Sequence, residues 1–114
     1  MASELIDLLI IGAGPAGMSA AIEARRHGLS VLVLDEQPSP GGQIYRNIRE
    51  SDPQRLAILG ADYSAGRSLA DEFIACGAGY VSGAAVWQVA EQCQVHYLIE
   101  GRAVVAQARR LLIA

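Results

Sequence analysis

Lysine is missing from this sequence of 114 residues, and all nine of its positively charged side chains are arginines. Without lysine, the chain offers neither the amine of a Schiff base nor the lysine of a phosphate-binding P-loop. The arginines form no basic run, and the formal net charge is −3. Because a basic surface is the usual mark of nucleic-acid binding, the charge disfavours nucleic acid as a partner.

Cysteine is scarce, and its two copies lie far apart in the sequence. Cys76 and Cys93 form no C-x-x-C motif, so the sequence indicates neither a redox dithiol nor a zinc knuckle. We expect two reduced thiols in the core of a cytosolic protein. The sequence also shows no Ser-His-Asp set, metal cluster or paired-acid arrangement, so catalytic residues stay unassigned and no metal site is expected.

Long apolar runs are absent as well. No stretch reaches the roughly 18 apolar residues that a membrane-spanning helix needs. Residues 5–11 are too short for a signal peptide and lack its basic flank. We therefore expect a cytoplasmic protein without a transmembrane segment, with membrane association through a partner as the alternative. Hydrophobic residues make up 52% of the chain, which together with the length predicts one well-buried α/β domain over residues 1–114.

What the chain does contain is a glycine motif between an apolar run, Ile6–Ile11, and an alanine-rich stretch with helical spacing, residues 15–27. The motif is G-x-G-x-x-G, with its glycines at Gly12, Gly14 and Gly17. Asp35 closes the next apolar run 23 positions after the first of these glycines. The order of strand, glycines, helix, strand and acid is typical of dinucleotide-binding folds.

Each part of this motif has a physical task. Gly12 lets the chain leave the strand in a tight turn, and Gly14 has no Cβ to hold a pyrophosphate away. Gly17 lets the helix pack closely on the strands. Pro15 suits a first helical turn because its N–H is missing and its φ is fixed. We expect the N–H groups of that turn to face phosphates; the alternative is a tight turn that binds nothing.

Beyond a second strand, Val31–Leu34, the sequence alternates between breakers and regular elements. Residues 37–42 are rich in glycine and proline and predict a loop close to the end of that strand. Asp52-Pro53 predicts the start of a short helix that ends at Gly60. A longer helix is expected over residues 63–76, because its apolar residues recur at helical spacing.

From Tyr80 onward, the hydrophobic period changes to that of strands. The expected segments are Tyr80-Val81, Ala85–Val89, Val95–Ile99 and Ala103–Ala106. Glu100-Gly101 fits a hairpin turn. A last apolar strand, Arg110–Ala114, has no cap or polar tail after it, so we expect a piece of a longer fold or a chain completed by a partner. An exposed strand of this kind also predicts association in solution.

The most selective part of the sequence follows the second strand. It runs Leu34-Asp35-Glu36-Gln37-Pro38-Ser39-Pro40-Gly41-Gly42-Gln43-Ile44-Tyr45-Arg46. Together with Leu59–Tyr63 and Val86-Trp87, this run resembles the FAD-binding subunits of bacterial dye-linked amino-acid oxidoreductases. That group includes the A subunits of opine oxidases, the larger subunit of hydrogen cyanide synthase, and the α subunits of proline and hydroxyproline dehydrogenases.

The order of elements is likewise similar to the FAD-binding domain of glutathione-reductase-like flavoproteins. The resemblance spans essentially the whole chain, but only the N-terminal part of those longer subunits. It implies an α/β, Rossmann-like FAD/NAD(P)-binding domain of three layers, with a parallel sheet and a β-meander, here apparently truncated. In this fold Arg110–Ala114 is the strand that returns beside the first one. The implied cofactor is FAD, with NAD(P) or ATP as an alternative second ligand.

The resemblance also implies roles for residues of the glycine motif and the acidic pair. The residues around the FAD pyrophosphate are implied to be Gly12, Gly14, Pro15, Ala16 and Gly17. Asp35 or Glu36 would accept hydrogen bonds from the hydroxyls of the adenosine ribose. Strand counting favours Asp35, because it directly follows Leu34, and Glu36 stays open as the alternative.

Three further residues receive roles from the same resemblance. Gly42 and Gln43 would approach the diphosphate or the ribityl chain, where glycine permits a close backbone approach. Val86 would offer main-chain groups to the edge of the adenine.

For the complete protein, the resemblance implies a flavin-dependent oxidoreductase that oxidises an amino acid or an opine-like amine and passes electrons to a second acceptor. It implies a homo- or hetero-oligomer in which the catalytic residues lie outside this segment, so the 114 residues alone are expected to be inactive. Two alternatives stay open. One is a non-catalytic adenine-nucleotide-binding module of a hetero-oligomer, and the other is an NAD(P)H-dependent flavin reductase resembling thioredoxin reductase.

Overall fold

The computed structural model describes the backbone of residues 5–38 and 61–114, and the side chains of residues 5–38 and 67–114. Within these ranges the chain forms two α-helices, a short 3-10 turn and six strands of one sheet. The elements are β1 (Ile6–Ile11), α1 (Pro15–Arg26), β2 (Val31–Asp35), α4 (Ala61–Ala75), β3 (Gly79–Ser82), β4 (Ala85–Ala90), η1 (Glu91–Cys93), β5 (Gln94–Ile99) and β6 (Arg102–Ile113). The short helix expected after Asp52-Pro53 lies outside the described residues.

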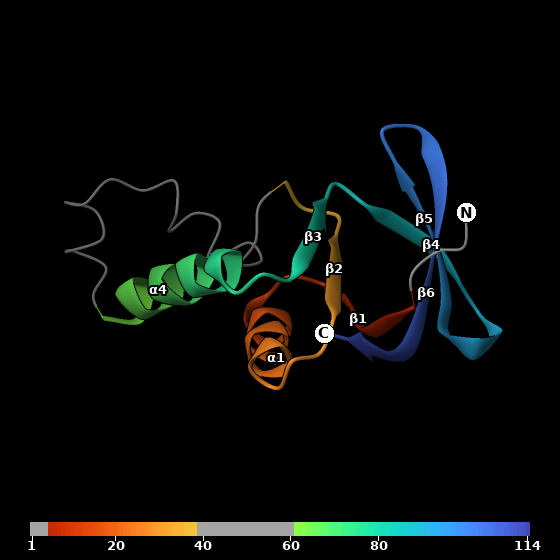
Figure 1. The fold of residues 1–114 in the computed structure, drawn as a ribbon. Helices are drawn as coiled ribbons and strands as arrows, with labels where there is room; N and C mark the ends of the chain where they lie inside the picture. The colour runs from red at the N-terminus through yellow and green to blue at the C-terminus, as the bar shows by residue number, and fades with distance from the viewer. Residues whose placement is uncertain (1–4, 39–60) are drawn as a thin grey trace.

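The described elements form three layers (Figure 1). The strand order is β3-β2-β1-β6-β5-β4, with parallel pairing between β3, β2, β1 and β6 and antiparallel pairing between β6, β5 and β4. Helices α1 and α4 lie on one side of the parallel strands, and the β4–β5–β6 meander lies on the other. This arrangement confirms the expected Rossmann-like α/β fold with a parallel sheet and a meander.

The continuous apolar sequence of β1 follows from this layering, because both faces of the strand are covered. Ile10 is fully buried in the cluster that also contains Met18 of α1 and Phe73 of α4. Its neighbour Leu9 is fully buried in the second cluster, which contains Tyr97 of the meander. A strand with only one buried face would alternate polar and apolar residues.

The last turn of α1 is held by the basic residues that the helix dipole favours there. Arg25 donates from Nη1 to the carbonyl of Leu29 at 2.9 Å and from Nε to the carbonyl of Cys76 at 3.3 Å. Gly28 follows with a φ of +77°, a conformation that suits glycine after a helix. Arg25 therefore ties the end of α1 to the residue that follows α4.

The expected hairpin at Glu100-Gly101 is also confirmed. Both residues have positive φ angles, 49° and 76°, as the favoured two-residue turn between antiparallel strands requires. The turn joins β5 to β6, whose pairing runs from Ile99 opposite Arg102 to Gln94 opposite Gln107.

The structure corrects the expectation of two separate final strands, Ala103–Ala106 and Arg110–Ala114. One continuous strand, β6, pairs with β5 over its first half and with β1 from Ala108 to Ile113. The polar residues in its middle break the apolar pattern without ending the strand, because the backbone stays extended while it passes from the meander to the parallel sheet. The returning strand does lie beside β1, as expected.

The same result bears on the predicted association in solution, which rests on an exposed final strand. β6 lies between β1 and β5 in the sheet, so it is not an edge strand along its full length. Its first half pairs with β5 alone, and its second half, from Ala108 to Ile113, pairs with β1 alone among the described residues. The last part of the strand therefore has an unpaired side in the described structure, and association in solution stays a prediction.

The amino ends of β1 and β2 are joined by a reciprocal pair of hydrogen bonds. The Ser30 N–H donates to Asp7 Oδ2 at 2.9 Å, and the Asp7 N–H donates to Ser30 Oγ at 2.8 Å. Arg109 Nε of β6 lies 3.4 Å from Asp7 Oδ1. The Ser30 N–H above all, with help from its hydroxyl and from Arg109, holds the pKa of Asp7 below its usual value.

No helix in the described parts of the chain is long and apolar enough to cross a membrane.

Candidate functional site

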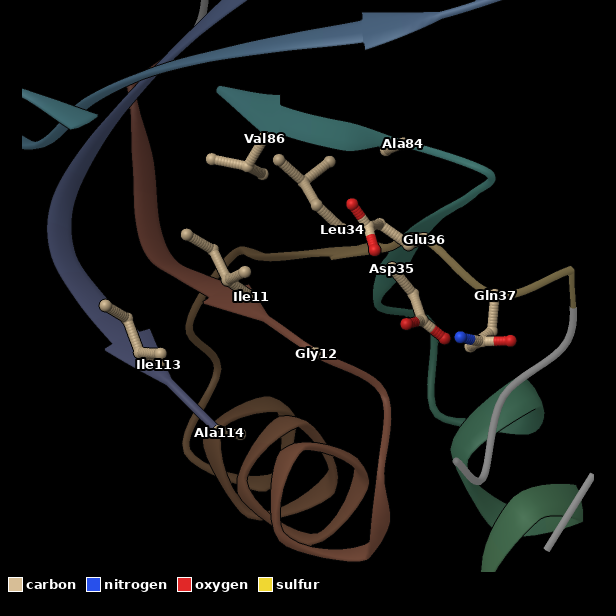
Figure 2. A pocket seen from close by; sticks show the side chains of 10 residues that line it. All are labelled: Ile11, Gly12, Leu34, Asp35, Glu36, Gln37, Ala84, Val86, Ile113 and Ala114. Atoms are coloured by element: carbon tan, nitrogen blue, oxygen red, sulfur yellow. The ribbon is translucent and has the colours of Figure 1, made fainter. Parts of the chain in front are cut away.

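A hollow of about 270 Å³ lies at the carboxyl ends of β1, β2 and β6, beside the start of β4 (Figure 2). It is lined by Ile11, Gly12, Leu34, Asp35, Glu36, Gln37, Ala84, Val86, Ile113 and Ala114. The carboxyl ends of the strands are where open α/β sheets bind their ligands. The hollow is therefore the candidate functional site.

The turn between β1 and α1 forms one border of the site. Gly12 has a φ of +109°, and its N–H donates to the carbonyl of Leu34 at 2.8 Å. Gly14 is the N-cap residue of α1, and a Cβ built at this position would meet no atom within 4 Å. Open space therefore lies next to the first N–H groups of α1, as an approaching phosphate needs.

Gly17 and Gly12 are required for a different reason, which is close packing. A Cβ on Gly17 would overlap the carbonyl oxygen of Gly12, and a Cβ on Gly12 would lie 2.8 Å from the carbonyl oxygen of Ala114. The first turn of α1, the end of β1 and the end of β6 therefore meet with no room for a side chain. This contact fixes where the helix begins relative to the sheet.

Asp35, the last residue of β2, is the buried acid of the site, with 8% of its surface exposed. Its Oδ2 atom is buried and has no hydrogen-bond partner among the described residues. Burial raises the pKa of Asp35 above its usual value, and the charge of Glu36 adds to this rise. The backbone N–H groups of Gln37, Ala13 and Glu36 act in the opposite direction. A ligand with hydroxyl donors would satisfy the free oxygen.

Glu36 lines the same hollow, but the residue itself is exposed to solvent. Figure 2 shows its carboxyl group directed toward Leu34, whereas the carboxyl group of Asp35 is directed toward Gln37. The two acids that the sequence left as alternatives therefore differ in burial and direction. Of these two acids, Asp35 is the one with a buried acceptor atom that has no partner in the described part of the chain.

The opposite wall of the hollow is apolar. Its side chains come from the ends of three parallel strands and from β4: Ile11, Leu34, Ile113 and Val86. The Ala84 N–H donates to the carbonyl of Asp35 at 2.8 Å, and the Gly83 N–H donates to the carbonyl of Gln37 at 3.2 Å. These two bonds fix the start of β4 against the acidic end of β2, so the apolar wall and the acids keep one relative position.

The hollow brings together four of the residues with expected binding roles, Gly12, Asp35, Glu36 and Val86. The other members of the glycine motif, Gly14, Pro15, Ala16 and Gly17, form the adjoining N-cap and first turn of α1. Gly42 and Gln43 lie outside the described residues.

Sequence reasoning missed several residues of the lining, namely Ile11, Leu34, Gln37, Ala84, Ile113 and Ala114. Leu34 and Ile11 carry a signal that was available, since each ends a strand beside the glycine motif or the acid. Ile113 and Ala114 carry no local signal; only the resemblance, which places Arg110–Ala114 beside the first strand, pointed to their position next to β1. Within the described residues, no group of three or more His, Cys, Asp and Glu side chains is placed to hold a metal ion.

A family model described as "NAD(P)-binding Rossmann-like domain" matches residues 10–73, which is more than half of the chain. The matched range includes the glycine turn, α1 and β2, which carry the N-terminal part of the hollow.

Two curated relatives are A subunits of opine oxidase. The protein from Agrobacterium tumefaciens (strain Ach5) is 53% identical over 87 residues, which are 76% of this chain and 17% of that subunit. The protein from Rhizobium meliloti (strain 1021) is 40% identical over 112 residues, which are 97% of this chain and 24% of that subunit. The chain therefore spans less than a quarter of the length of these relatives.

Among solved structures, L-proline dehydrogenase from P. horikoshii is similar with a TM-score of 0.72 and 20% identity, covering 98% of this chain and 22% of that chain. The flavin-dependent brominase Bmp2 is similar with a TM-score of 0.70 and 19% identity, covering 97% of this chain and 38% of that chain. At these identities the likeness establishes the fold alone. That fold agrees with the one expected from the sequence.

Proposed function

This chain belongs to the NAD(P)-binding Rossmann-like domain family, and on that premise we propose that it binds the adenosine and diphosphate part of FAD within a flavin-dependent oxidoreductase. The observation that carries the proposal is the buried Oδ2 of Asp35, which has no partner among the described residues, beside a glycine turn with open space at Gly14. The ribose hydroxyls of a dinucleotide can donate hydrogen bonds to Asp35, and its diphosphate can occupy the space at the glycine turn.

The start of α1 suits the diphosphate. The helix has twelve residues and no acidic side chain of its own in its first turn, so its first N–H groups and positive dipole end favour an anion there. Gly12, Gly14, Pro15, Ala16 and Gly17 would surround the diphosphate. Gly42 and Gln43 remain our candidates for the continuation toward the ribityl chain, on the strength of the sequence alone.

The hollow suits the adenosine. Asp35 would accept hydrogen bonds from the ribose hydroxyls, and the apolar wall would cover a face of the adenine, which loses contact with water when it binds. Val86 would add main-chain groups at the edge of the ring. We assign the ribose to Asp35 rather than to Glu36, because a buried acceptor without a partner is costly until a donor reaches it.

For the complete protein we propose oxidation of an amino acid or opine-like amine, with electrons passed to a second acceptor. The bound flavin supplies the redox chemistry; the residues of this chain bind and orient its adenosine end. The support is the identity with opine oxidase A subunits. Because the chain spans 17% and 24% of those subunits, we expect residues 1–114 to act as one FAD/NAD(P)-binding domain that is inactive alone.

We also propose that the complete protein is a homo- or hetero-oligomer. The word "subunit" in the names of its opine oxidase relatives supports this. A cytoplasmic location is our proposal too, since Cys76 and Cys93 are both free thiols in the structure and reduced cysteines are usual in that compartment. Membrane association, if present, would come through a partner.

A second function is favoured by the extent of the hollow. Its lining joins the acids at the end of β2 to the glycine turn, which are the contacts that an adenine nucleotide needs. A non-catalytic module that holds ADP or ATP would use the same residues.

The two functions differ in colour. If the chain carries FAD, the purified protein is yellow, absorbs visible light and releases FAD on denaturation. Added FAD then binds to the stripped protein with a stoichiometry of one. A colourless protein that binds ADP but not FAD would assign the adenine-nucleotide module. A protein that binds neither would contradict both functions.

A further inference from the structure

The outer face of the β4–β5–β6 meander departs from the pattern of a solvated sheet. An antiparallel sheet with one face on the core normally alternates apolar residues inward with polar residues outward. The inward positions follow this rule, since Val95 and Tyr97 of β5 are buried in the core. Leu98 of β5 and Val105 of β6 are each 43% exposed, and Trp87 of β4 is 55% exposed. Large apolar side chains therefore meet solvent where polar ones are expected.

The exposed side chains lie together on this outer face. His96 is paired with Val105 across β5 and β6, and Leu98 is paired with Ala103. The ring of Trp87 lies beside the ring of His96, with the two centroids 5.1 Å apart. Paired residues of neighbouring strands point to the same side of a sheet. We call the resulting patch the meander face, and its members are Trp87, His96, Leu98, Ala103 and Val105.

The meander face contains no Asp, Glu, Lys or Arg, unlike other described surfaces of the chain. On the helical side of the sheet, Arg26 forms ion pairs with Glu23 and Glu72. The hollow at the carboxyl ends of the strands is lined by two acids. In a two-fold contact between copies of one chain, the same patch lies on both sides, so a charge near the axis meets a charge of its own sign. The meander face avoids this repulsion.

The absence of charge also favours a second copy over a protein of different sequence. Unlike partners are usually selected by charges that complement each other, and the meander face offers none. Its apolar centre gives way to the next outward pair, Gln94 and Gln107, which matches the apolar core and polar rim of protein interfaces.

The size of the face sets the strength of such a contact. Strands β4 and β5 have six residues each, and three strands of this length cover roughly 300 Å². A stable complex buries about 800 Å² on each partner. We therefore expect an association that depends on concentration rather than a permanent dimer.

We propose that the meander face is a self-association surface, on which a second copy of this chain docks about a two-fold axis near the middle strand, β5. This inference goes beyond the nucleotide site and assigns a surface to a homo-oligomer. Trp87 provides the largest apolar side chain of the contact, and tryptophan is among the residues that most often dominate binding at interfaces. Docking removes the ring of Trp87 from water.

The wild-type chain allows a test without any mutation, because Trp87 is its single tryptophan. We expect analytical ultracentrifugation to show monomers and dimers in equilibrium, with a Kd on the order of 100 μM. The fluorescence of Trp87 should shift to shorter wavelength with the same midpoint, because its ring becomes buried. A chain that stays monomeric from about tenfold below to about tenfold above this concentration would overturn the proposal. Association without a change in Trp87 emission would also overturn it, because the contact would then lie elsewhere, for example at the unpaired side of β6.

Leu98→Lys tests the position of the contact. It places like charges on both copies near the proposed axis, so we expect Kd to rise by at least about tenfold and the emission shift to be lost. Ile74→Lys is the matched control, since Ile74 is a 53% exposed apolar residue of α4, on the helical side of the sheet. It changes the net charge by the same amount, and Kd should stay within about twofold of the wild type. Equal effects of the two variants, or no effect of Leu98→Lys, would contradict the proposal.

Two further measurements keep this test independent of folding and of the nucleotide site. Circular dichroism checks that Leu98→Lys is folded; if it is not, Leu98→Thr removes apolar surface with a residue that strands favour and should raise Kd by about threefold or more. ADP affinity should be the same in Leu98→Lys, Ile74→Lys and the wild type, because neither residue lines the hollow. A chain that dimerises through the meander face but binds no ADP would refute the proposed function and support this surface.

Discussion

The two ends of the parallel strands each carry an aspartate, and the two aspartates have opposite surroundings. At the amino end, Asp7 receives the Ser30 N–H at 2.9 Å and lies 3.4 Å from Arg109. At the carboxyl end, Asp35 is buried and its Oδ2 has no partner among the described residues. The pKa of Asp7 is lowered and that of Asp35 is raised.

This difference separates stability from function. The charged form of Asp7 is satisfied by the fold itself, so that end of the sheet needs nothing from outside. The carboxylate of Asp35 receives only part of the hydrogen bonds that it can accept from the described residues, so a ligand with donor groups can supply the rest. Parallel sheets generally place their sites at the carboxyl end, and here the hydrogen-bond partners of two acids show the same asymmetry.

The largest expected effect concerns the glycine turns at the two ends. Gly17→Val at the carboxyl end would drive a side chain into the carbonyl of Gly12, so we expect the free energy of unfolding to fall by at least about 3 kcal/mol. In Gly28→Ala, near the amino end of β2, the added Cβ meets no atom within 4 Å. Its only cost is the strain of an alanine at a φ of +77°, which lowers the free energy of unfolding by about 1 kcal/mol. Urea unfolding followed by circular dichroism measures both. Equal losses would show that the carboxyl-end turn is not the tighter of the two.

The next effect concerns the acids themselves. Asp35→Ala should weaken ADP binding by about 2–3 kcal/mol, or roughly 30- to 150-fold, because charge-assisted hydrogen bonds to the ribose are lost. Asp7→Ala should leave the affinity unchanged, since Asp7 lies at the opposite end of β1. Calorimetric titration measures both variants. A loss of affinity in Asp7→Ala of the same size would remove the functional distinction between the two ends.

A smaller effect distinguishes the glycine that leaves room for a ligand, Gly14, from the glycines that permit close packing. Gly14→Val has open space around its Cβ, so the variant should fold with nearly wild-type stability. Its side chain would occupy the path of the diphosphate, and we expect ADP affinity to fall by about tenfold. A folded Gly14→Val that binds ADP normally would move the diphosphate away from this turn.

The smallest effect is a pair of opposite pH dependences. Asp7 has a lowered pKa, so its stabilising contribution is present above the usual value of 3.8 and is lost as pH falls through the folded-state pKa. Asp35 has a raised pKa, so its contribution to folding is greatest below 3.8 and declines as pH rises through the folded-state pKa. Replacing each with asparagine should remove its own slope from a plot of unfolding free energy against pH. Slopes of the same sign would contradict the contrast.

The sequence predicted the N-terminal part of the site well because that part is local. A strand, a glycine turn, a helix and an acid follow one another within 30 residues of β1, α1 and β2 (Ile6–Asp35), and each has its own pattern. The burial that distinguishes Asp35 from Glu36 was not predictable in the same way. It depends on Ala84 and Gly83, which bind the end of β2 from a distant part of the chain.

The C-terminal part of the site shows more clearly what the local sequence pattern does not predict. Ile113 and Ala114 reach the hollow only because β6 continues from the meander into the parallel sheet. Its polar middle, at Gln107, Arg109 and Arg110, predicts an interruption from local pattern alone. The roles of Gly42 and Gln43 remain predictions, since they lie outside the described residues.

The most direct test of this contrast is an NMR titration of the ¹⁵N-labelled chain with ADP. We predict that amide signals move at the carboxyl end of the sheet, at Gly12, Gly14, Glu36 and Val86, and that those of Asp7 and Ser30 at the amino end stay in place. Signals that move at Asp7 and Ser30 while the glycine turn stays unchanged would contradict the account.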